Sequence, residues 1–226
     1  MRITVIIPAL NEESVIDQAI ASAWEAGADE VIVVDGGSDD RTVAVAKEYN
    51  CKVVAAPKGR ASQQNAGARE ATGDVFLFLH ADSRLGESAC QQIRDALERP
   101  DVAGGALRQR IEANGLGYRI LEQGNAWRVR WLGLPYGDQA IFVRREEFEE
   151  LGGFPEVKLM EDLLLMKQLR RKAWPVLLPG LVFVDARRWQ QHGIIRQTLR
   201  NWWLLAAHKL GKSPDQLATY YRRHDE

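Results

Sequence analysis

Residues 3–42 read ITVIIPALNEESVIDQAIASAWEAGADEVIVVDGGSDDRT, and this stretch decides the fold class. It opens with a β-branched run at residues 3–8 that has little polar interruption, which is typical of a strand covered on both faces of a parallel sheet. Apolar residues then recur every three or four positions over residues 12–26, which predicts a helix with one buried face. A second apolar run at residues 31–34 completes a unit of strand, helix and strand.

The same alternation continues along the chain. Further strands are predicted at residues 52–55 and 75–79, and further helices at residues 41–49 and 61–71. Four strands alternating with helices predict an α/β fold with a mostly parallel sheet flanked by helices. In such folds ligands bind outside the carboxyl ends of the strands, so the loops that follow the strands are where chemistry is expected.

Beyond residue 100 the pattern is less regular. It predicts strands at 102–111, 140–143 and 176–184, the last with a Pro179-Gly180 turn inside it, and helices at 118–131, 163–171 and 191–210. Because there is no repeat, low-complexity segment or linker, we expect one α/β domain over residues 1–186. Residues 187–226 are expected to form a helical C-terminal extension packed on the same domain.

The composition excludes several classes of protein. With 226 residues, 46% hydrophobic and 27% charged, the chain has the balance of a soluble globular protein and not of a disordered or collagen-like one. A net charge of -1 argues against a general nucleic-acid binder. Two cysteines without CxxC spacing are typical of reduced thiols, and no apolar run approaches the roughly 18 residues of a spanning helix. These observations predict a cytoplasmic protein.

The C-terminal part is more basic than the rest. From residue 187 onward it carries eight Lys and Arg against three Asp and Glu. In the last helix these basic residues alternate with Ile, Leu and Trp, a pattern that suits the surface of an anionic membrane. The pattern predicts peripheral contact with the inner membrane face through residues 191–212, and packing of this helix on the sheet or on another subunit is the alternative interpretation.

Polar loops follow the first four strands, and they read PALNE, DGGSDD, PKGR and HAD at residues 8–12, 35–40, 57–60 and 80–82. In the second loop Asp35 precedes two glycines that allow a ligand to approach the backbone, which favours a nucleotide site; a capped turn is the alternative. The chain lacks both the G-x-G-x-x-G and the G-x-x-x-x-G-K-[ST] patterns, so neither a dinucleotide fingerprint nor a P-loop is predicted.

Two further pairs of residues could carry chemistry. His80 and Asp82 follow a buried strand, with alternate side chains on the same side, and could hold a divalent cation; capping of the next helix is the alternative. Glu161 and Asp162 stand at a predicted helix start, where acids are favoured by the helix dipole, and taken alone they are better explained by capping. The functional interpretation is that one of them accepts a proton from an acceptor hydroxyl.

Read in order, these motifs and Gly152-Gly153-Phe154 resemble family-2 glycosyltransferases of the GT-A fold over roughly residues 3–185. The stretch from residue 187 to 211 resembles a bacterial subgroup of small, soluble members. The resemblance implies a nucleotide-diphosphate-sugar donor, a hydroxyl acceptor and a divalent metal, Mn²⁺ or Mg²⁺. It also implies inversion at the anomeric carbon by a single displacement.

The resemblance also assigns roles by position. It implies that the nucleoside pocket is lined by Pro8, Ala9, Glu12, His80 and Ala81, that Asp35 contacts the base or ribose, and that Arg60 faces the diphosphate or base. It implies that Asp82 binds the metal as the last acid of an Asp-x-Asp element whose first acid is His80 here. His192 is a second candidate metal ligand, with a solvated helix cap as the alternative. Asp162 matches the catalytic base, and Glu161 beside it helps to place the acceptor.

Other features bear on the competing functions. The Gln-x-x-Arg-Trp element of processive synthases is absent, which argues against processive synthesis. Asp138 is an acceptor-side candidate, and a simple turn is the alternative. For Tyr118, Trp127 and Trp131, core packing of an amphipathic helix is favoured over a sugar-stacking wall. A nucleotidyltransferase is disfavoured because the loop after the first strand is acidic, with Glu12 and Glu13, where such enzymes tend to carry a Gly-rich, basic phosphate loop. A non-catalytic nucleotide-sugar-binding protein is the remaining alternative.

Overall fold

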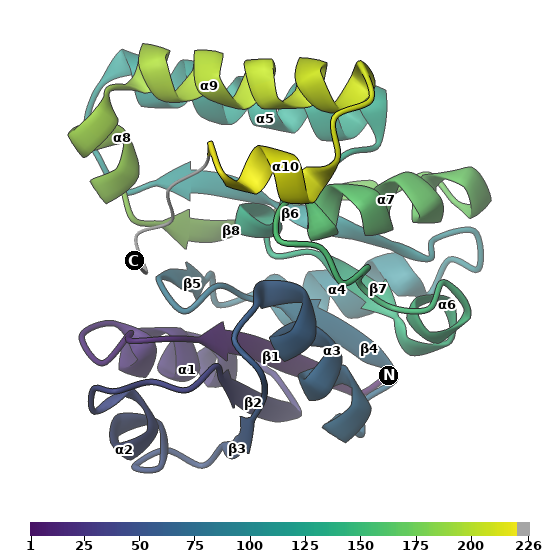
Figure 1. Ribbon diagram of the computed structural model, residues 1–226. Helices are drawn as coiled ribbons and strands as arrows, with labels where there is room; N and C mark the ends of the chain where they lie inside the picture. The colour runs from purple at the N-terminus through teal and green to yellow at the C-terminus, as the bar shows by residue number, and fades with distance from the viewer. Residues whose placement is uncertain (221–226) are drawn as a thin grey trace.

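The computed structural model describes residues 1–220, apart from the side chains of Arg188 and His192. These residues form one eight-stranded sheet with the order β3-β2-β1-β4-β7-β6-β8-β5 (Figure 1). The strands are β1 (Ile3–Ala9), β2 (Glu30–Asp35), β3 (Lys52–Ala55), β4 (Val75–Phe78), β5 (Ser83–Leu85), β6 (Gly104–Ile111), β7 (Phe142–Arg144) and β8 (Val176–Val184). Within this described part β7 and β5 run against their neighbours, and the other strands point one way.

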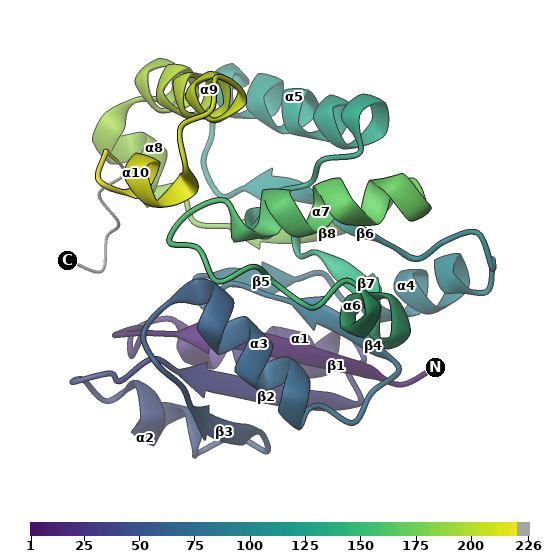
Figure 2. The ribbon, with the colours of Figure 1, turned by 45° about the vertical axis from the view of Figure 1, so that its right-hand side comes forward.

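Helices cover both faces of the sheet, as Figures 1 and 2 show. They are α1 (Ile16–Glu25), α2 (Thr42–Ala46), α3 (Arg60–Glu70), α4 (Ala89–Leu97), α5 (Leu116–Leu132), α6 (Arg145–Glu150), α7 (Glu161–Lys172), α8 (Arg187–His192), α9 (Ile194–Lys209) and α10 (Pro214–Ala218), with a short 3₁₀ turn η1 (Gly137–Gln139). The predicted α/β fold with a mostly parallel sheet flanked by helices is confirmed.

Each central strand contributes side chains to two hydrophobic cores, one on each face of the sheet. In β4, Val75 and Leu77 pack with α1 and α4 on one face, whereas Phe76 and Phe78 pack with α3, α6 and α7 on the other. Because successive side chains of a strand point to opposite faces, a strand between two helical layers must be apolar throughout. This explains the unbroken apolar runs of the first strands.

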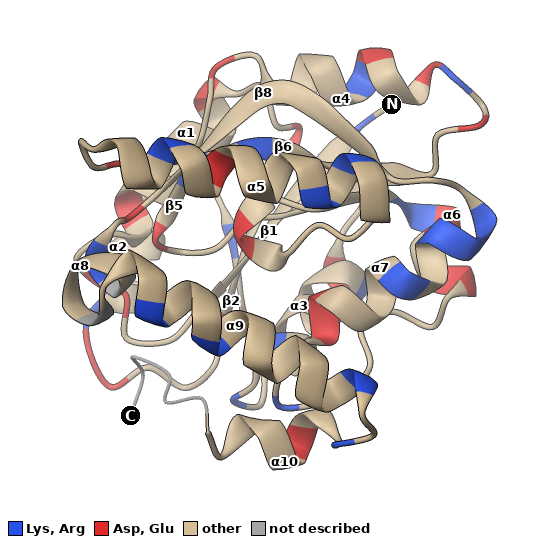
Figure 3. Cartoon of the chain, turned by 90° about the horizontal axis from the view of Figure 1, so that it is seen from above, with Lys and Arg blue, Asp and Glu red and all other residues tan. Residues whose placement is uncertain are grey.

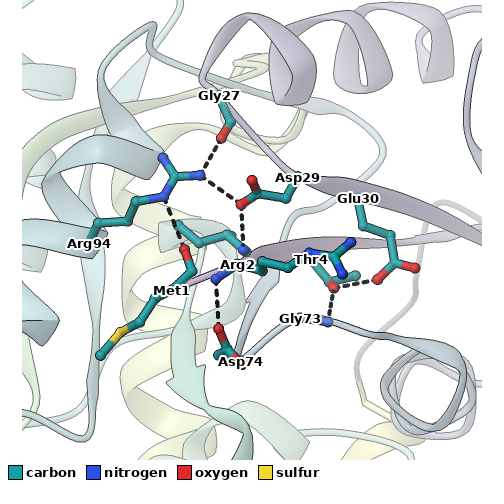
Figure 4. A network of polar contacts seen from close by, with 10 residues as sticks. Met1, Arg2, Thr4, Gly27, Asp29, Glu30, Gly73, Asp74 and Arg94 are labelled. Atoms are coloured by element: carbon teal, nitrogen blue, oxygen red, sulfur yellow. Dashed lines mark hydrogen bonds and ion pairs between the residues drawn. The ribbon is translucent and has the colours of Figure 1, made fainter.

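The edge of the sheet where the strands begin is fastened by polar contacts, drawn in Figure 4. The Arg94 guanidinium donates to the Gly27 carbonyl and, at 2.7 Å, to the Asp29 carboxylate, which also accepts from the Ile3 N–H at 2.7 Å. Partial burial acts to raise the pKa of Asp29, but the hydrogen bonds from Ile3 and Arg94 outweigh it and hold that pKa below its usual value.

A second contact in the same network joins β1 to β2. Thr4 faces Glu30 in the parallel register, and its hydroxyl donates to the Glu30 carboxylate at 2.6 Å. The same carboxylate accepts from the Thr72 N–H. Burial acts to raise the pKa of Glu30. These hydrogen bonds lower it more strongly, so the pKa lies below its usual value.

Two expectations for the C-terminal half are wrong. The predicted helix over 191–210 is instead two helices, because Gly193 (φ 77°, ψ 142°) has a backbone conformation that no helix contains. The Pro179-Gly180 turn is absent, and β8 runs through both residues. The register with β6 shifts there, from Leu107 opposite Leu178 to Arg108 opposite Leu181, which is a bulge.

The core-packing interpretation of the α5 aromatics is also wrong for two of the three residues. Tyr118 packs against the core, but Trp127 and Trp131 are 59% and 77% exposed. The reason is that α5 contacts the sheet through its opposite face, where Ala126 and Val129 are buried.

The C-terminal helices pack on the rest of the chain through one side only. Trp189 of α8 joins the main core, and Leu204 of α9 packs with Leu217 of α10 and with Leu159. The opposite side of α9 leaves Ile195, Leu199, Trp202, Trp203 and Leu210 exposed, so the packing alternative accounts for only part of this helix. No helix within residues 1–220 is both long and apolar enough to cross a membrane.

Candidate functional site

A cavity of about 990 Å³ lies at the carboxyl edge of the sheet. Its wall comes from segments far apart in the sequence, namely residues 8–12, 58–63, 80–82, 156–159 and 184–187, with Asp138 and parts of α8 and α10. The cavity therefore combines the loops that follow β1, β3, β4 and β8. This is where a ligand site is expected in an open α/β sheet.

The end of β1 and the loop that follows it place Pro8, Ala9 and Glu12 on the cavity wall. The backbone of this loop is fixed by the loop after β2. The Asn11 N–H donates to the Ser38 hydroxyl at 3.0 Å, and the Glu12 N–H donates to the Thr42 hydroxyl at 2.8 Å.

Asp35 is placed differently from these residues, because it is not part of the cavity wall. Its buried carboxylate accepts from the Gly37 N–H at 3.0 Å and from the Ser38 hydroxyl at 2.5 Å. Gly37 has a φ of 93°, which favours glycine. Asp35 thus fixes the turn at residues 36–38, and Ser38 of this turn supports the loop after β1 through its hydrogen bond with Asn11.

The loop after β4 places His80, Ala81 and Asp82 on the cavity wall. It is short because β4 ends at Phe78 and β5 begins at Ser83, yet the two strands are far apart in the strand order. β5 pairs with β8 at the edge of the sheet, so this loop joins the central strand β4 to an edge strand of a curled sheet. Asp82 is half-buried, and Ser83 donates to its carboxylate at 3.3 Å.

Basic side chains come to the cavity from three segments. Lys58 and Arg60 lie at the start of α3, Lys158 lies in the loop before α7, and Arg187 begins α8. The Arg60 guanidinium is 3.7 Å from the carboxylate of Glu161, whose side chain is only 2% exposed. Glu161 is therefore held against Arg60 and is not on the cavity wall.

Asp162 lies beside His80 and Gly137, just behind the cavity wall. Its carboxylate accepts from the Gly137 N–H at 2.5 Å. A Cβ atom added at Gly137 would stand 2.7 Å from Nε2 of His80 and 3.3 Å from Oδ2 of Asp162, so the three residues pack tightly together. The structure thus brings the predicted base next to the predicted donor-side histidine.

The turn that carries Gly137 and Asp138 rests on a half-buried arginine. Arg128 donates to Gln139 at 2.6 Å and to Asn125 at 2.9 Å, and its guanidinium carbon is 3.3 Å from the centre of the Tyr136 ring. Burial lowers the pKa of Arg128, opposed by Tyr136 and by the carboxylates of Asp138 and Asp162. The guanidinium therefore provides positive charge behind both carboxylates.

The loop that reaches the cavity before α7 begins with two glycines. Gly152 and Gly153 have φ values of 79° and 76°, and Asn65 then forms two hydrogen bonds with the backbone of Phe154, at 2.8 and 2.9 Å. Phe154 packs edge-to-face on Phe78 at 4.7 Å. The Gly-Gly-Phe motif thus anchors residues 156–159 over the cavity.

Backbone strain in the described residues is concentrated around this site. The non-glycine residues with positive φ there are Asn11 (55°), Ala140 (47°) and Met160 (66°). Asn11 lines the cavity, Ala140 follows η1, and Met160 immediately precedes Glu161. Strain of this kind persists where the surrounding structure fixes functional groups.

The donor set for a metal is small. Among the described residues no three His, Cys, Asp or Glu side chains are grouped to hold an ion. Mg²⁺, however, is usually held by one or two carboxylates together with substrate phosphates and water. Asp82 on the cavity wall fits that mode of binding, whereas the side chain of His192 lies outside the described residues.

Several residues of the cavity wall were not predicted. Lys158, Asp185, Arg187 and Asp215 all line it. Asp185 could have been found, because it follows the predicted strand 176–184 just as Asp35 and Asp82 follow theirs. Asp138, the acceptor-side candidate, lies on the cavity wall, and its carboxylate accepts from Gln109 at 2.9 Å.

Comparison with known proteins identifies the family. Residues 4–152 match Glycosyl transferase family 2. The chain belongs to this family. The family match confirms the resemblance that the loop motifs indicated, and it confirms that the protein is a glycosyltransferase.

Among curated relatives of this glycosyltransferase, the probable glycosyltransferase YdaM of Bacillus subtilis is 26% identical over 230 residues, which cover 89% of this chain and 53% of YdaM. A dolichol-phosphate mannosyltransferase of Pyrococcus furiosus is 33% identical over 116 residues, covering 47% of this chain and 33% of that protein. The chain spans about half or less of the length of these relatives.

Solved structures share the fold of this glycosyltransferase. TarS 1-349 of S. aureus aligns with a TM-score of 0.67 at 18% identity, over 82% of this chain and 61% of that one. The mannosyltransferase PcManGT of Pyrobaculum calidifontis, solved with GDP-Man and Mn²⁺, aligns with a TM-score of 0.67 at 19% identity, over 96% of this chain and 66% of that one. TarS was also solved with UDP and with UDP-GlcNAc.

Proposed function

We propose that this family 2 glycosyltransferase moves a sugar from a nucleotide-diphosphate-sugar donor to a hydroxyl acceptor, with inversion and with the assistance of a divalent metal. One observation carries the proposal. A single cavity at the carboxyl edge of the sheet combines the loop at residues 8–12, basic residues at the start of α3 and the Asp82 carboxylate, and Asp162 lies behind its wall beside His80.

The donor would lie along the loops after β1 and β4. Pro8, Ala9 and Glu12 would hold the nucleoside together with His80 and Ala81, and Arg60 and Lys58 would face the diphosphate. Guanidinium and ammonium groups are suited to phosphate oxygens. The nucleotides in the structures of TarS and PcManGT support this class of donor. Asp35 would act by holding the turn at residues 36–38, and a direct contact with base or ribose would require it to release Ser38.

Asp82 would hold Mn²⁺ or Mg²⁺ through its carboxylate, with His192 as a proposed second ligand. When bound, the cation would supply positive charge to the leaving diphosphate. The Mn²⁺ and Mg²⁺ ions in structures of the same fold support metal use. Arg60 and Lys58 would add fixed positive charge on the same side, aimed at the charge that grows as the glycosidic bond breaks.

Asp162 would accept the proton of the acceptor hydroxyl. The Gly137 N–H fixes one of its oxygens, which orients the carboxylate. A single base is sufficient for an inverting displacement, since the acceptor oxygen attacks the anomeric carbon directly while the diphosphate leaves on the other face. Glu161 would help to place the acceptor through its ion pair with Arg60.

The proposal extends to the organisation of the chain. Residues 1–186 would form the GT-A domain that carries the donor and base residues. Residues 187–226 would form an extension packed on that domain, and of these the structure describes residues up to 220. The extension contributes Arg187, Trp189 and Asp215 to the cavity wall, so the site would be incomplete without it.

The decisive variant is Asp162→Asn, assayed for transfer and for hydrolysis with a panel of nucleotide sugars. Losing a positioned general base should reduce turnover by roughly 10²- to 10⁴-fold and leave the donor affinity unchanged. Asp101→Asn, an exposed carboxylate in an ion pair far from the cavity, is the matched control and should retain full turnover. Full turnover of Asp162→Asn would show that the base is another residue, and tight donor binding without turnover by the native protein would favour a non-catalytic binding protein.

A further inference from the structure

Two helices at one end of the molecule expose apolar side chains on the same surface. In Figures 1 and 2 α5 and α9 lie side by side above the sheet, and Figure 3 shows this end face-on. The helices meet near their first turns, where a Cβ atom added at Gly117 would stand 2.9 Å from Ile194. We call this the α5–α9 surface. Its exposed apolar residues are Leu116, Ile120, Trp127, Trp131 and Leu132 of α5 and Ile195, Leu199, Trp202, Trp203 and Leu210 at α9.

The spacing of these residues makes a stripe on each helix. On α5, Leu116, Ile120 and Trp131 are separated by four and eleven residues, and on α9, Ile195, Leu199 and Leu210 are separated by the same intervals. At 3.6 residues per turn, such intervals keep side chains on one face. Trp131 and Leu210 are 77% and 88% exposed, so the stripes point away from the protein.

The charges beside the stripes have one sign. Arg130, Arg196 and Lys209 are exposed on the two helices, and α9 contains no Asp or Glu (Figure 3). The acid of α5 is Glu122, which is only 11% exposed and lies 3.0 Å from the Arg119 guanidinium. The α5–α9 surface therefore presents apolar and cationic groups without an exposed carboxylate.

We propose that the α5–α9 surface docks on anionic lipid headgroups, with its tryptophans and leucines inserted at the boundary between headgroups and acyl chains. Tryptophan favours that boundary because its ring is apolar and its N–H is polar. A symmetric contact between two copies would bring Arg130, Arg196 and Lys209 of each copy toward like charges, which disfavours self-association. The inference does not depend on the proposed sugar transfer.

Sedimentation with vesicles tests the proposal. The native protein should pellet with vesicles of phosphatidylcholine containing phosphatidylglycerol, should bind pure phosphatidylcholine vesicles much more weakly, and should be released as salt screens the charges. Arg196→Gln together with Lys209→Gln should weaken binding roughly 25-fold, at about fivefold for each charge removed. The matched control removes two exposed charges on other helices, Lys47→Gln with Arg69→Gln, and should bind as the native protein does.

Tryptophan variants separate insertion from electrostatic attraction. Replacing Trp127, Trp131, Trp202 and Trp203 by Gln should abolish pelleting. Replacing the same four and Trp174, which is 51% exposed and donates to the Arg130 carbonyl at 3.2 Å, by Phe should preserve pelleting but remove most of the quenching of tryptophan fluorescence by brominated lipids, because Trp24 and Trp189 remain elsewhere in the fold. Melting curves of each variant would confirm that it is folded.

Three results would overturn the proposal. The first is the absence of binding to the anionic vesicles at low salt. The second is binding equal to that of the native protein by the variant with all four tryptophans replaced by Gln. The third is sedimentation equilibrium showing a dimer that the four Gln substitutions dissociate, with no vesicle binding, which would assign the surface to a second copy of the chain.

Discussion

Gly137 allows a close contact between two residues of the proposed site, because it has no side chain. His80 and Asp162 approach each other across its Cα, and the space that a Cβ atom would need is already occupied. We predict that Gly137→Ala separates the two side chains and reduces kcat by about 100-fold, the order of effect expected of a 1 Å displacement in an active site. Steady-state kinetics would measure it, with Gly124→Ala, where nothing lies within 4 Å of the added atom, as control. Unchanged kcat in Gly137→Ala would remove this contact from the proposed machinery.

Asp29 predicts a dependence of stability on acid. Its pKa in the folded protein lies below the usual 3.8, so its contribution is present above about pH 3.8 and is lost as the pH falls through the folded-state value. Asp29→Asn should therefore be less stable than the native protein at pH 7, by about 1 kcal/mol or less because the side chain is 36% exposed and its charge is screened by solvent. The difference in melting temperature between the two proteins should become smaller as the pH falls from 3.8 toward about 2.

Glu98→Gln, which removes another exposed carboxylate near the same end of α4, serves as the control for this experiment. Its melting temperature should follow that of the native protein over the whole pH range. A difference between Asp29→Asn and native protein that persists at pH 2 would mean that Asp29 acts by packing and not by charge.

At the scale of elements, two glycines have opposite expected effects on stability. Gly193 joins α8 to α9 with φ 77° and ψ 142°, so Gly193→Ala should cost about 1–3 kcal/mol of strain and lower the melting temperature. Gly124 lies in the interior of α5 with open space around it, and Gly124→Ala should gain about 1 kcal/mol, or roughly 2–4 °C in a chain of this size. Calorimetry of both variants checks the pair; equal melting temperatures would contradict it.

The long elements could be predicted from the sequence, and the short ones could not. β1, β2 and α1 follow apolar patterns that their own residues contain. β5 has three residues, and it is a strand only because it pairs with β8, about a hundred residues later in the chain. The bulge in β8 depends on its pairing with β6, and the break between α8 and α9 depends on the backbone angles of Gly193. The spacing of apolar residues in the sequence predicts neither.

At the scale of the whole molecule, the donor and the metal should stabilise the protein together. A nucleoside diphosphate at 100 times its dissociation constant adds about 2.7 kcal/mol, which corresponds to roughly 5–10 °C here. We predict such a shift in melting temperature for one nucleotide in the presence of Mn²⁺, and its loss in Asp82→Ala. A panel of five nucleoside diphosphates, with and without metal, would identify the base.

Asp39→Asn, in the neighbouring loop but outside the cavity wall, is the control and should keep the full shift. An equal shift in Asp82→Ala and native protein would exclude Asp82 as the metal ligand. If no nucleotide shifts the native protein, the proposed donor site is contradicted.

The location of the site was predictable, but its full composition was not. Loops after β1 and β4 could be assigned to one sheet edge because parallel strands end together, and this places Glu12 and Asp82 in one cavity. Lys158 reaches the cavity from the loop that the Gly-Gly-Phe motif anchors, and Asp215 reaches it from the C-terminal helix α10. Neither position follows from strand order. The ion pair of Glu161 with Arg60 is likewise a consequence of tertiary packing.

The pairing of β5 with β8 also sets the time at which the site can exist during synthesis. Asp82 leaves the ribosome early, but the strand that follows it has no partner until Val184 has been translated. At about 5–20 residues per second this delay is roughly 5–20 seconds. β1, β2 and β4 are all translated before that interval begins, so these strands are available to pair with one another while the strand that follows Asp82 still has no partner.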